Sequence, residues 1–437
     1  MDKIKACILT LGCRVNQNES DAIMQELSSY GVEICDIDTP CDIYIINTCT
    51  VTAESDRKSR QFIRRCTNIK KDSVVIVTGC FSQLNPDEVL NFDGVDYVCG
   101  NNGKSSIAKK ALSLLKEKRQ KEMFMPDIFS GVYDHMSVSV PLTRTRAFIK
   151  IEDGCNSSCA YCVIPKARGS VRSDTKENIL SQVKSAVAGG CKEVVLTGIE
   201  TSAYGLDFKN GYDLASLLCD VNKVDGLERI RLGSLDPASI NKSFVDKVCV
   251  LEKLMPHFHL SMQSGCTKTL NDMRRKYNIE MAKNNINYLR QMIPGCMLSA
   301  DVITGFPGET DENFSETIEF FRETKFLRLH IFPYSRRKDT EAYSMKNQIA
   351  EEIKKERLKT LSGIQKEIKK ELQDGFCKNN DSVCVLFEDS AGDIYRGHAP
   401  NFMEVKAKSA SDIHGKILRV TNLKNDGEFI YGDIIND

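Results

Sequence analysis

The chain has 437 residues, with 60 Lys and Arg side chains balanced by 60 Asp and Glu, so its formal net charge is zero. A neutral chain creates no overall field that would draw it to nucleic acid or to an anionic membrane, and any nucleic-acid site must be a local patch. No apolar stretch approaches the roughly 20 residues of a membrane span, and the N-terminal residues lack the features of a signal peptide. We therefore expect a cytoplasmic protein of two or three domains with no membrane partner.

Cysteine is the unusual part of the composition, with 18 residues spread along the whole chain. In a reducing cytosol so many cysteines do not form a disulfide framework. Many are expected to be small buried side chains, and some are expected to bind metal.

Residues 1–118 alternate short apolar runs with amphipathic segments, which predicts an α/β domain with an open parallel sheet. The predicted strands are Ala6–Leu11, Val32–Asp38, Asp42–Asn47 and Val74–Thr78. The predicted helices are Ser20–Tyr30, Ser55–Thr67 and Ser105–Lys116. The turn-rich stretch Phe124–Gly131 follows, and we interpret residues 119–144 as a linker between domains.

Residues 145–372 form a second α/β region with six predicted strands. Six βα units are too few for an eightfold barrel but suit a partial (β/α)6 barrel, whose chemistry lies on loops at the C-terminal ends of the strands. The predicted strands are Ala147–Ile151, Glu193–Thr197, Arg229–Leu232, His257–Leu260, Leu298–Ile303 and Arg328–Phe332. The predicted helices include Thr175–Ala188, Thr267–Arg275 and Asp311–Thr324.

Residues 373–437 have the texture of a small β-barrel, with short strands separated by Gly and Asn turns. A Lys/Glu-rich helix over Glu351–Gln373 leads into this region. From Gly375 onward, seven Lys and Arg stand against ten Asp and Glu, a balance that does not favour RNA binding. The predicted strands are Ser382–Phe387, Asp393–His398, Met403–Lys406, Lys416–Thr421 and Glu428–Ile434.

Three cysteines in one tight loop, Cys155, Cys159 and Cys162, directly follow the first strand of the second region. A structural zinc site wants four ligands, usually from paired C-x-x-C knuckles, and no second knuckle is present. A ferredoxin-like run needs a fourth cysteine nearby, whereas the next here is Cys191. Three thiolates leave one iron of a cubane cluster open, and the amino and carboxylate groups of S-adenosylmethionine (SAM) can chelate that iron.

This loop resembles the radical SAM superfamily, whose signature is C-x-x-x-C-x-x-C with an aromatic residue, here Tyr161, before the last cysteine. The resemblance implies reductive cleavage of SAM to methionine and a 5′-deoxyadenosyl radical. It also implies SAM contacts at successive strand ends and in a later loop. The expected contact residues are Gly198, Glu200, Ser234, Asp236 and Arg337, with the adenine beside Ala300–Glu309.

A second set of cysteines, Cys13, Cys49 and Cys80, has no C-x-x-C spacing, but each follows a predicted strand of the N-terminal domain. The C-terminal ends of the strands in an open parallel sheet line one crevice, so three thiols far apart in sequence can meet there. Spacing alone leaves a metal site and unligated thiols both open. Cys7, Cys35 and Cys99 lie in or beside apolar runs and are expected to be ordinary buried thiols.

The segments Thr10–Ser20, Ile46–Thr52 and Thr78–Cys80 resemble the methylthiotransferase family. That resemblance implies an N-terminal domain with a second 4Fe-4S cluster, a radical SAM barrel and a C-terminal TRAM β-barrel. It further implies that two 4Fe-4S clusters and two SAM molecules per turnover insert a methylthio group into an unactivated C–H bond.

Among the branches of the family, the Gly12–Ser20 segment is most similar to the MtaB-like branch. The implied reaction is the 2-methylthiolation of N6-threonylcarbamoyladenosine at position 37, next to the tRNA anticodon. The implied partners are tRNA, an electron donor such as flavodoxin or ferredoxin, and a sulfur source. Glu200 departs from the pattern, because this branch usually has His there, and Asp339 replaces a usual Gly.

Basic residues between Asp56 and Asp72 are candidates for phosphate binding, as are Lys166, Arg168 and Arg172, although a solvated helix face explains the first run equally simply. Two alternatives to the MtaB-like reading stay open. One is another branch of the family, acting on isopentenyladenosine in tRNA or on an aspartate of a ribosomal protein. The other is a non-catalytic RNA-binding protein with structural zinc.

Overall fold

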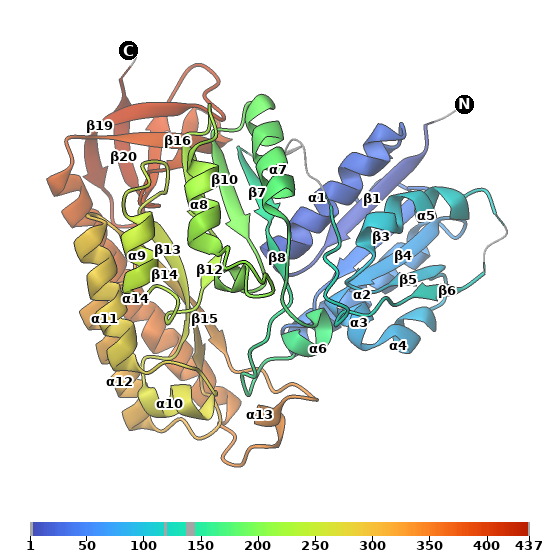
Figure 1. Cartoon of the computed structure of the whole chain (residues 1–437), viewed down its shortest axis with the longest axis horizontal. Helices are drawn as coiled ribbons and strands as arrows, with labels where there is room; N and C mark the ends of the chain where they lie inside the picture. Colours follow the sequence, from blue (N-terminus) through green and yellow to red (C-terminus); the bar gives the residue numbers. More distant parts are fainter. Residues whose placement is uncertain (1–2, 118–119, 137–144, 436–437) are drawn as a thin grey trace.

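A computed structural model describes residues 3–117, 120–136 and 145–435. The N-terminal domain is an open, fully parallel sheet of six strands in the order β2-β1-β3-β4-β5-β6 (Figure 1). The two central strands, β3 and β4, are buried along their whole length, as expected of a parallel sheet covered on both faces. The strands are β1 (Lys5–Thr10), β2 (Glu33–Ile34), β3 (Ile43–Thr48), β4 (Val74–Gly79), β5 (Tyr97–Cys99) and β6 (Glu122–Phe124).

Five helices cover this sheet in two layers. Residues of α1 and α5 pack with one set of alternating strand residues, and residues of α2, α3 and α4 pack with the other set. The predicted α/β architecture is therefore confirmed. The helices are α1 (Arg14–Ser29), α2 (Ala53–Ile69), α3 (Cys80–Leu84), α4 (Pro86–Leu90) and α5 (Ile107–Leu114).

Three local predictions were wrong in this domain. The strand expected over Val32–Asp38 shrinks to the two residues of β2, because a turn occupies residues 37–39. Helix α1 starts at Arg14 rather than Ser20, since the polar side chains of its first turns are buried and break the apolar pattern that marks a helix. Strand β6 lies in the segment expected to be linker and extends the sheet edge. The linker boundaries predicted at 118/119 and at 144 lie outside the described residues.

The central domain is the predicted partial barrel. Its strands run parallel in two adjoining sheets, β11-β10-β7 and β12-β13-β14-β15, and a break at Gly233 separates β11 from β12. A β-carbon at Gly233 would lie 2.7 Å from Oγ1 of Thr201, so the chain passes too closely there for a side chain. The strands are β7 (Arg146–Lys150), β10 (Glu193–Thr197), β11 (Arg229–Leu232), β12 (Ser234–Leu235), β13 (His257–Gln263), β14 (Met297–Thr304) and β15 (Arg328–Pro333).

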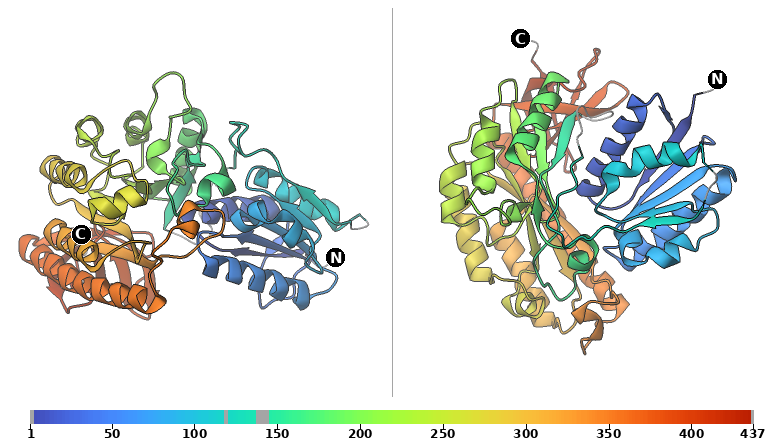
Figure 2. Two further views of the ribbon diagram at one scale, coloured as in Figure 1. Left: turned by 90° about the horizontal axis from the view of Figure 1, so that it is seen from below. Right: turned by 45° about the vertical axis from the view of Figure 1, so that its right-hand side comes forward.

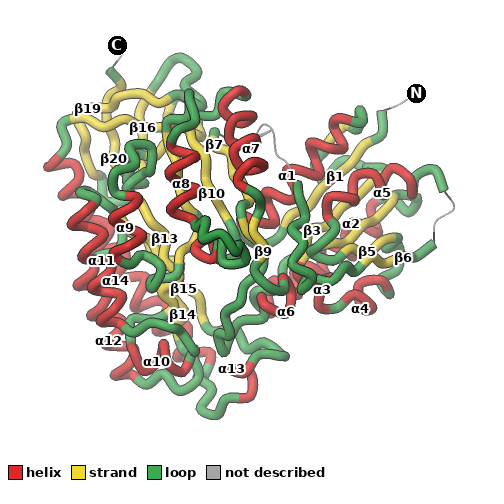
Figure 3. Tube along the Cα trace, in the orientation of Figure 1, coloured by secondary structure: helices red, strands yellow, loops and turns green. Residues whose placement is uncertain are grey.

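Helices flank the barrel strands, and α9, α11 and α12 lie on the side away from the N-terminal domain (Figures 1 and 2). In Figure 3 the barrel strands lie between these helices and the N-terminal domain. No helix among residues 3–117, 120–136 and 145–435 is long and apolar enough to cross a membrane. The helices named here are α7 (Lys176–Ala188), α8 (Leu214–Asn222), α9 (Lys242–Val248), α11 (Ile279–Met292), α12 (Asp311–Thr324) and α14 (Glu351–Asn379).

The C-terminal domain is a closed five-stranded barrel in the order β16-β17-β18-β20-β19, at the end of helix α14. All five predicted strands are present, and the TRAM-like expectation is confirmed at the level of fold. They are β16 (Ser382–Ala391), β17 (Ile394–His398), β18 (Glu404–Lys408), β19 (Ile417–Asn425) and β20 (Ile430–Ile434).

Arginines of the partial barrel hold the C-terminal barrel in place. The guanidinium of Arg229 donates to the carbonyls of His398 and Cys384, and that of Arg231 donates to the carbonyls of Ala399 and Pro400, all at 2.9–3.0 Å. The buried carboxylate of Glu193 lies 2.9 Å from Nε of Arg146 and 3.0 Å from Nε of Arg231. This carboxylate therefore offsets the positive charge of the joint between the two domains.

We predict that Glu193→Ala destabilises the protein by about 3–5 kcal/mol, because it leaves buried guanidinium groups without their carboxylate. The measurement is the free energy of the urea unfolding transition that involves the C-terminal barrel. Glu228→Ala is the matched control, because Glu228 pairs with Lys192 on the surface, where both side chains are 45% exposed. The control should cost less than about 1 kcal/mol, and equal losses in the two variants would contradict the proposed role of Glu193.

Candidate active site

The first cysteine triad, Cys155, Cys159 and Cys162, lies in the loop between strand β8 (Glu152–Asp153) and helix α6 (Ile164–Arg168). Backbone N–H groups two residues on point at two of the sulfurs: Ser157 N–H donates to Cys155 Sγ and Ile164 N–H donates to Cys162 Sγ, each at 3.4 Å. Such donors favour the thiolate that a metal ligand must be. The loop is therefore shaped to present three sulfurs of one metal centre.

The turn into this loop depends on Gly154. Its φ angle is +88°, and a β-carbon there would lie 2.0 Å from the carbonyl oxygen of Ser170. Any side chain at this position would push the loop away from the strand that follows α6. The loop is closed on the same side by a hydrogen bond of 3.0 Å from Cys155 N–H to the carbonyl of Gly169.

Arg275 joins the first triad to a residue expected to contact SAM. Its Nη1 donates to Cys159 Sγ at 3.3 Å, and its Nη2 donates to Oδ2 of Asp236 at 2.8 Å. Tyr161 lies next to these groups, and its ring meets the Phe306 ring in an edge-to-face arrangement with 6.4 Å between the ring centroids. Sequence reasoning missed Arg275, because it is one of several basic residues after the α10 helix (Thr267–Asp272) and no spacing distinguishes it.

The structure brings most of the predicted SAM residues together. Gly198 packs on Oε2 of Glu152, which also accepts a 2.9 Å hydrogen bond from Glu200 N–H. The hydroxyl of Ser202 donates to the Glu200 carboxylate and accepts from Asp236 N–H at 3.2 Å. Ser234 opens strand β12, two residues before Asp236. Burial raises the pKa of the Glu200 carboxyl, and the nearby Asp236 charge raises it further, although the Ser202 hydrogen bond opposes this shift.

Arg337 lies elsewhere, against the N-terminal domain. Its guanidinium forms an ion pair with Asp56 and donates to Oγ1 of Thr50 at 2.6 Å. Thr50 directly follows Cys49 in the chain. The expected contact between Arg337 and SAM thus stays a prediction. In the structure this side chain connects the partial barrel to the N-terminal domain.

The second triad forms at the C-terminal ends of three neighbouring strands, as its position in the sequence predicted. Cys13 is the N-cap of α1 after β1, Cys49 follows β3, and Cys80 is the first residue of α3 after β4. A β-carbon on Gly12 would lie 2.8 Å from Cys49 Sγ, so the Cys13 loop packs directly on Cys49. Burial, with the neighbouring Cys80 and Cys13, raises the pKa of Cys49 to about 11, and the thiol must lose its proton when metal binds.

The ligand chemistry of both triads fits an iron–sulfur cluster. Among the described residues, no group of three or more His, Cys, Asp or Glu side chains is close enough to hold a single metal ion. Structural zinc takes four ligands around one ion, whereas a four-iron cluster takes one sulfur on each of several irons and so spreads its ligands apart. Three thiols at each site match the number of protein ligands that leaves one iron of a four-iron cluster open.

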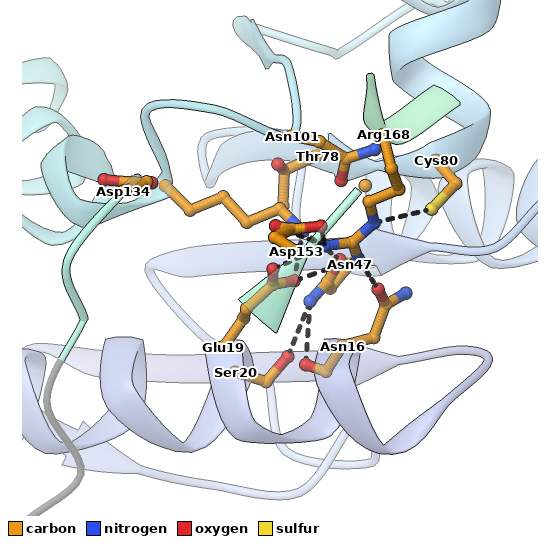
Figure 4. A network of polar contacts seen from close by, with 12 residues as sticks. Asn16, Glu19, Ser20, Asn47, Thr78, Cys80, Asn101, Asp134, Asp153 and Arg168 are labelled. Atoms are coloured by element: carbon orange, nitrogen blue, oxygen red, sulfur yellow. Dashed lines mark hydrogen bonds and ion pairs between the residues drawn. The ribbon is translucent and has the colours of Figure 1, made fainter. Parts of the chain in front are cut away.

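A buried network of charged side chains reaches Cys80 of the second triad (Figure 4), and its members Asp153 and Arg168 flank the loop of the first triad in the chain. At its centre Arg168 of α6 contacts Oε1 of Glu19 at 2.7 Å and Oδ2 of Asp153 at 3.0 Å. Lys150 also contacts both carboxylates, at 3.0 and 3.1 Å, and Lys104 pairs with Glu19. All five side chains are at most 3% exposed, and they come from both the N-terminal domain and the partial barrel.

This network corrects two predictions about phosphate binding. Arg168 is fully buried, and Arg172 donates through Nη1 to the carbonyls of Ile128, Arg168 and Ser170, so neither faces solvent. Acidic partners on α2 itself and on other segments also neutralise much of the basic run that α2 begins. The ion pairs there are Arg57–Glu54, Arg60–Glu88, Arg65–Asp38 and Lys70–Asp42.

Comparison with known proteins agrees with this geometry. Residues 5–100 match a family described as uncharacterised protein family UPF0004, and residues 149–321 match the radical SAM superfamily. The chain is 38% identical over 433 residues to the threonylcarbamoyladenosine tRNA methylthiotransferase MtaB of Bacillus subtilis, covering 96% of this chain and 95% of that protein. It is 37% identical to the MtaB protein of Aquifex aeolicus, covering 95% and 100%.

A solved structure supports the fold alone. The radical SAM methyltransferase TsrM of Kitasatospora setae, solved with cobalamin and a 4Fe-4S cluster bound, superposes with a TM-score of 0.57 at 15% identity, covering 78% of this chain and 77% of that one. The two domain matches and the extensive similarity to curated relatives lead to one conclusion. The chain belongs to the radical SAM methylthiotransferase family, whose superfamily chemistry requires SAM and a 4Fe-4S cluster.

Proposed function

We propose that this enzyme converts N6-threonylcarbamoyladenosine at position 37 of tRNA to its 2-methylthio derivative. The observation that carries the proposal is a pair of cysteine triads in adjoining domains, connected by one buried network that contacts Cys80 and flanks the Cys155–Cys162 loop, in a chain 38% identical to an MtaB protein over almost its full length. One triad alone would support radical chemistry without a route for sulfur. Two triads from adjoining domains suit a reaction that needs both a radical and a source of sulfur.

The residues divide into two sites. Cys155, Cys159 and Cys162 hold the radical SAM cluster, and Cys13, Cys49 and Cys80 hold a second 4Fe-4S cluster. When bound, the first cluster supplies the electron that cleaves SAM, and the second presents the sulfur that is methylated and transferred, with two SAM molecules used per turnover. Around SAM we place Tyr161, Gly198, Glu200, Ser234 and Asp236. Arg337 stays a proposed SAM contact from the side of the N-terminal domain, where it pairs with Asp56 and Thr50.

The chain's own groups explain how a SAM molecule is oriented. Gly198 at the end of β10 has no side chain, which lets Glu152 pack directly against its backbone, and a β-carbon there would lie 2.5 Å from Oε2 of Glu152. Asp236 and Glu200 present carboxylates suited to the amino group or the ribose of SAM. Arg275 fixes the Asp236 carboxylate through a 2.8 Å hydrogen bond and so limits its rotation.

The remaining parts of the proposal concern organisation and partners. We assign residues 1–118 to the N-terminal domain, with strand β6 (Glu122–Phe124) of the following segment completing its sheet, and the rest of residues 119–144 to a linker. Residues 145–372 form the radical SAM barrel and residues 373–437 the TRAM-like barrel. The enzyme works on tRNA in the cytoplasm, with flavodoxin or ferredoxin as electron donor and a separate source of sulfur.

The substrate is tested in a bacterial strain that lacks its own threonylcarbamoyladenosine methylthiotransferase. Expression of this chain should restore 2-methylthio-N6-threonylcarbamoyladenosine in tRNA, as measured by mass spectrometry of digested nucleosides. Cys80→Ala should abolish the product, because the second triad loses a ligand. Cys384→Ala is the matched control, since this thiol is exposed and lies outside both triads, and it should leave the product unchanged. Formation of the isopentenyladenosine derivative instead would assign the chain to another branch.

The number of clusters is tested by iron content after anaerobic reconstitution. The wild-type chain should bind about eight irons, and replacing all three cysteines of either triad by alanine should leave about four. The absorbance near 400 nm should fall by about half in each triple variant. About four irons in the wild-type chain, or zinc in place of iron, would refute the two-cluster arrangement.

A further inference from the structure

We propose that Arg168 is a positioning residue that raises the reduction potential of the cluster on Cys13, Cys49 and Cys80, through its hydrogen bond to Cys80. Nε of Arg168 donates to Cys80 Sγ at 3.3 Å. The inference rests on the proposed function in one respect only, namely that the second triad holds a cluster. It adds that a residue of the radical SAM domain controls the electronic state of the cluster in the neighbouring domain.

The position of Arg168 in the chain makes this contact informative. Arg168 ends α6, the short helix that starts two residues after Cys162. It therefore belongs to the same local segment as the first triad, while its side chain reaches into the N-terminal domain and meets a sulfur of the second triad (Figure 4). One side chain thus contacts the second metal site directly and is anchored beside the first.

The orientation of the guanidinium is fixed from three sides. Nη1 donates to Glu19 and Asp153, at 2.7 and 3.0–3.1 Å, and Nη2 donates to Oδ1 of Asn16. These acceptors occupy the two terminal nitrogens, so Nε is the donor left to face Cys80. A planar group held in this way keeps its N–H aimed at one sulfur, which a flexible lysine cannot do.

The charge balance of the network favours the reduced cluster. The cations Arg168, Lys104 and Lys150, with Arg172 3.8 Å from Asp153, outnumber the carboxylates of Glu19 and Asp153, which leaves an excess of positive charge in a buried region. Reduction adds one electron, and so one negative charge, to the cluster. A hydrogen bond to a ligand sulfur and a nearby positive charge both stabilise that added charge, which raises the reduction potential.

The first triad has a comparable contact in a different electrostatic setting. Arg275 donates to Cys159 Sγ at 3.3 Å, but Asp236 pairs with the same guanidinium at 2.8 Å and offsets its charge. Each triad therefore has one arginine on one sulfur, and the two arginines belong to separate clusters of side chains. This arrangement provides a matched control within the same protein.

The experiment is an anaerobic potentiometric titration of the reconstituted full-length chain, followed by electron paramagnetic resonance. The Cys155/Cys159/Cys162→Ala background isolates the second cluster, and the Cys13/Cys49/Cys80→Ala background isolates the first. Arg168→Gln removes both the charge and the Nε donor, so the midpoint potential of the second cluster should shift to more negative values. Arg168→Lys retains the charge, so its shift should have the same sign and be smaller.

Arg275→Gln is the matched control. It should leave the midpoint of the second cluster unchanged and shift that of the first, whereas Arg168→Gln should leave the first unchanged. Iron content near four per chain and an unaltered circular dichroism spectrum establish that each variant is folded and loaded. If Arg168→Gln does not load, Arg168→Lys alone decides the sign of the shift.

Two results would overturn the inference: a midpoint of the second cluster that stays at its original value in the loaded Arg168 variants, or an equal shift in Arg275→Gln. Failure of the proposed function looks different. A protein with two clusters that leaves tRNA unmodified would refute the function while the potentials could still be measured. Unchanged potentials in an enzyme that methylthiolates tRNA would refute the role of Arg168 alone.

Discussion

The arrangement of the two cysteine triads depends on the ion pairs of one buried carboxylate, that of Glu19. It contacts Arg168 and Lys150 of the partial barrel and Lys104 of its own domain, in a region from which water is excluded. Removing one member of such a set leaves an uncompensated charge and costs several kcal/mol, far more than a surface pair. Domain separation would expose or unpair all of these groups together, so the N-terminal domain and the barrel are held in one relative position.

Strand geometry places the chemistry within that rigid frame. Both triads follow the C-terminal ends of parallel strands, one in the open sheet and one in the partial barrel, where loops are free to carry functional groups. Glycines at the two sites leave out a side chain where the chain packs closely: Gly12 lies against the side chain of Cys49, and Gly154 lies against the carbonyl of Ser170. Close packing of this kind lets short loops bring distant cysteines together without long connecting segments.

Much of this could be predicted from sequence, because the cysteine positions and the alternation of apolar runs report local geometry. The first triad was predicted from spacing, and the second from its position after three strands together with the resemblance to the methylthiotransferase family. The role of Arg168 could not be predicted from the sequence. Its partner Glu19 is far from it in the chain, and no sequence pattern marks Asp153 as a partner. The start of α1 was also concealed because polar residues such as Asn16 are buried there, whereas a helix is predicted from the periodicity of apolar residues.

The joint to the C-terminal barrel has a consequence for how the family can diversify. Arg229 and Arg231 donate hydrogen bonds to backbone carbonyls of residues 384 and 398–400, while Glu388 and Phe402 are the C-terminal side chains that arginines of the partial barrel also contact. Every amino acid has a backbone carbonyl, so mutations can change the residues on the outer surface of this barrel while these hydrogen bonds to the partial barrel remain. The surface residues of the C-terminal domain can thus change while its attachment to the partial barrel stays the same, and the excess of acidic residues in this chain is one such surface composition.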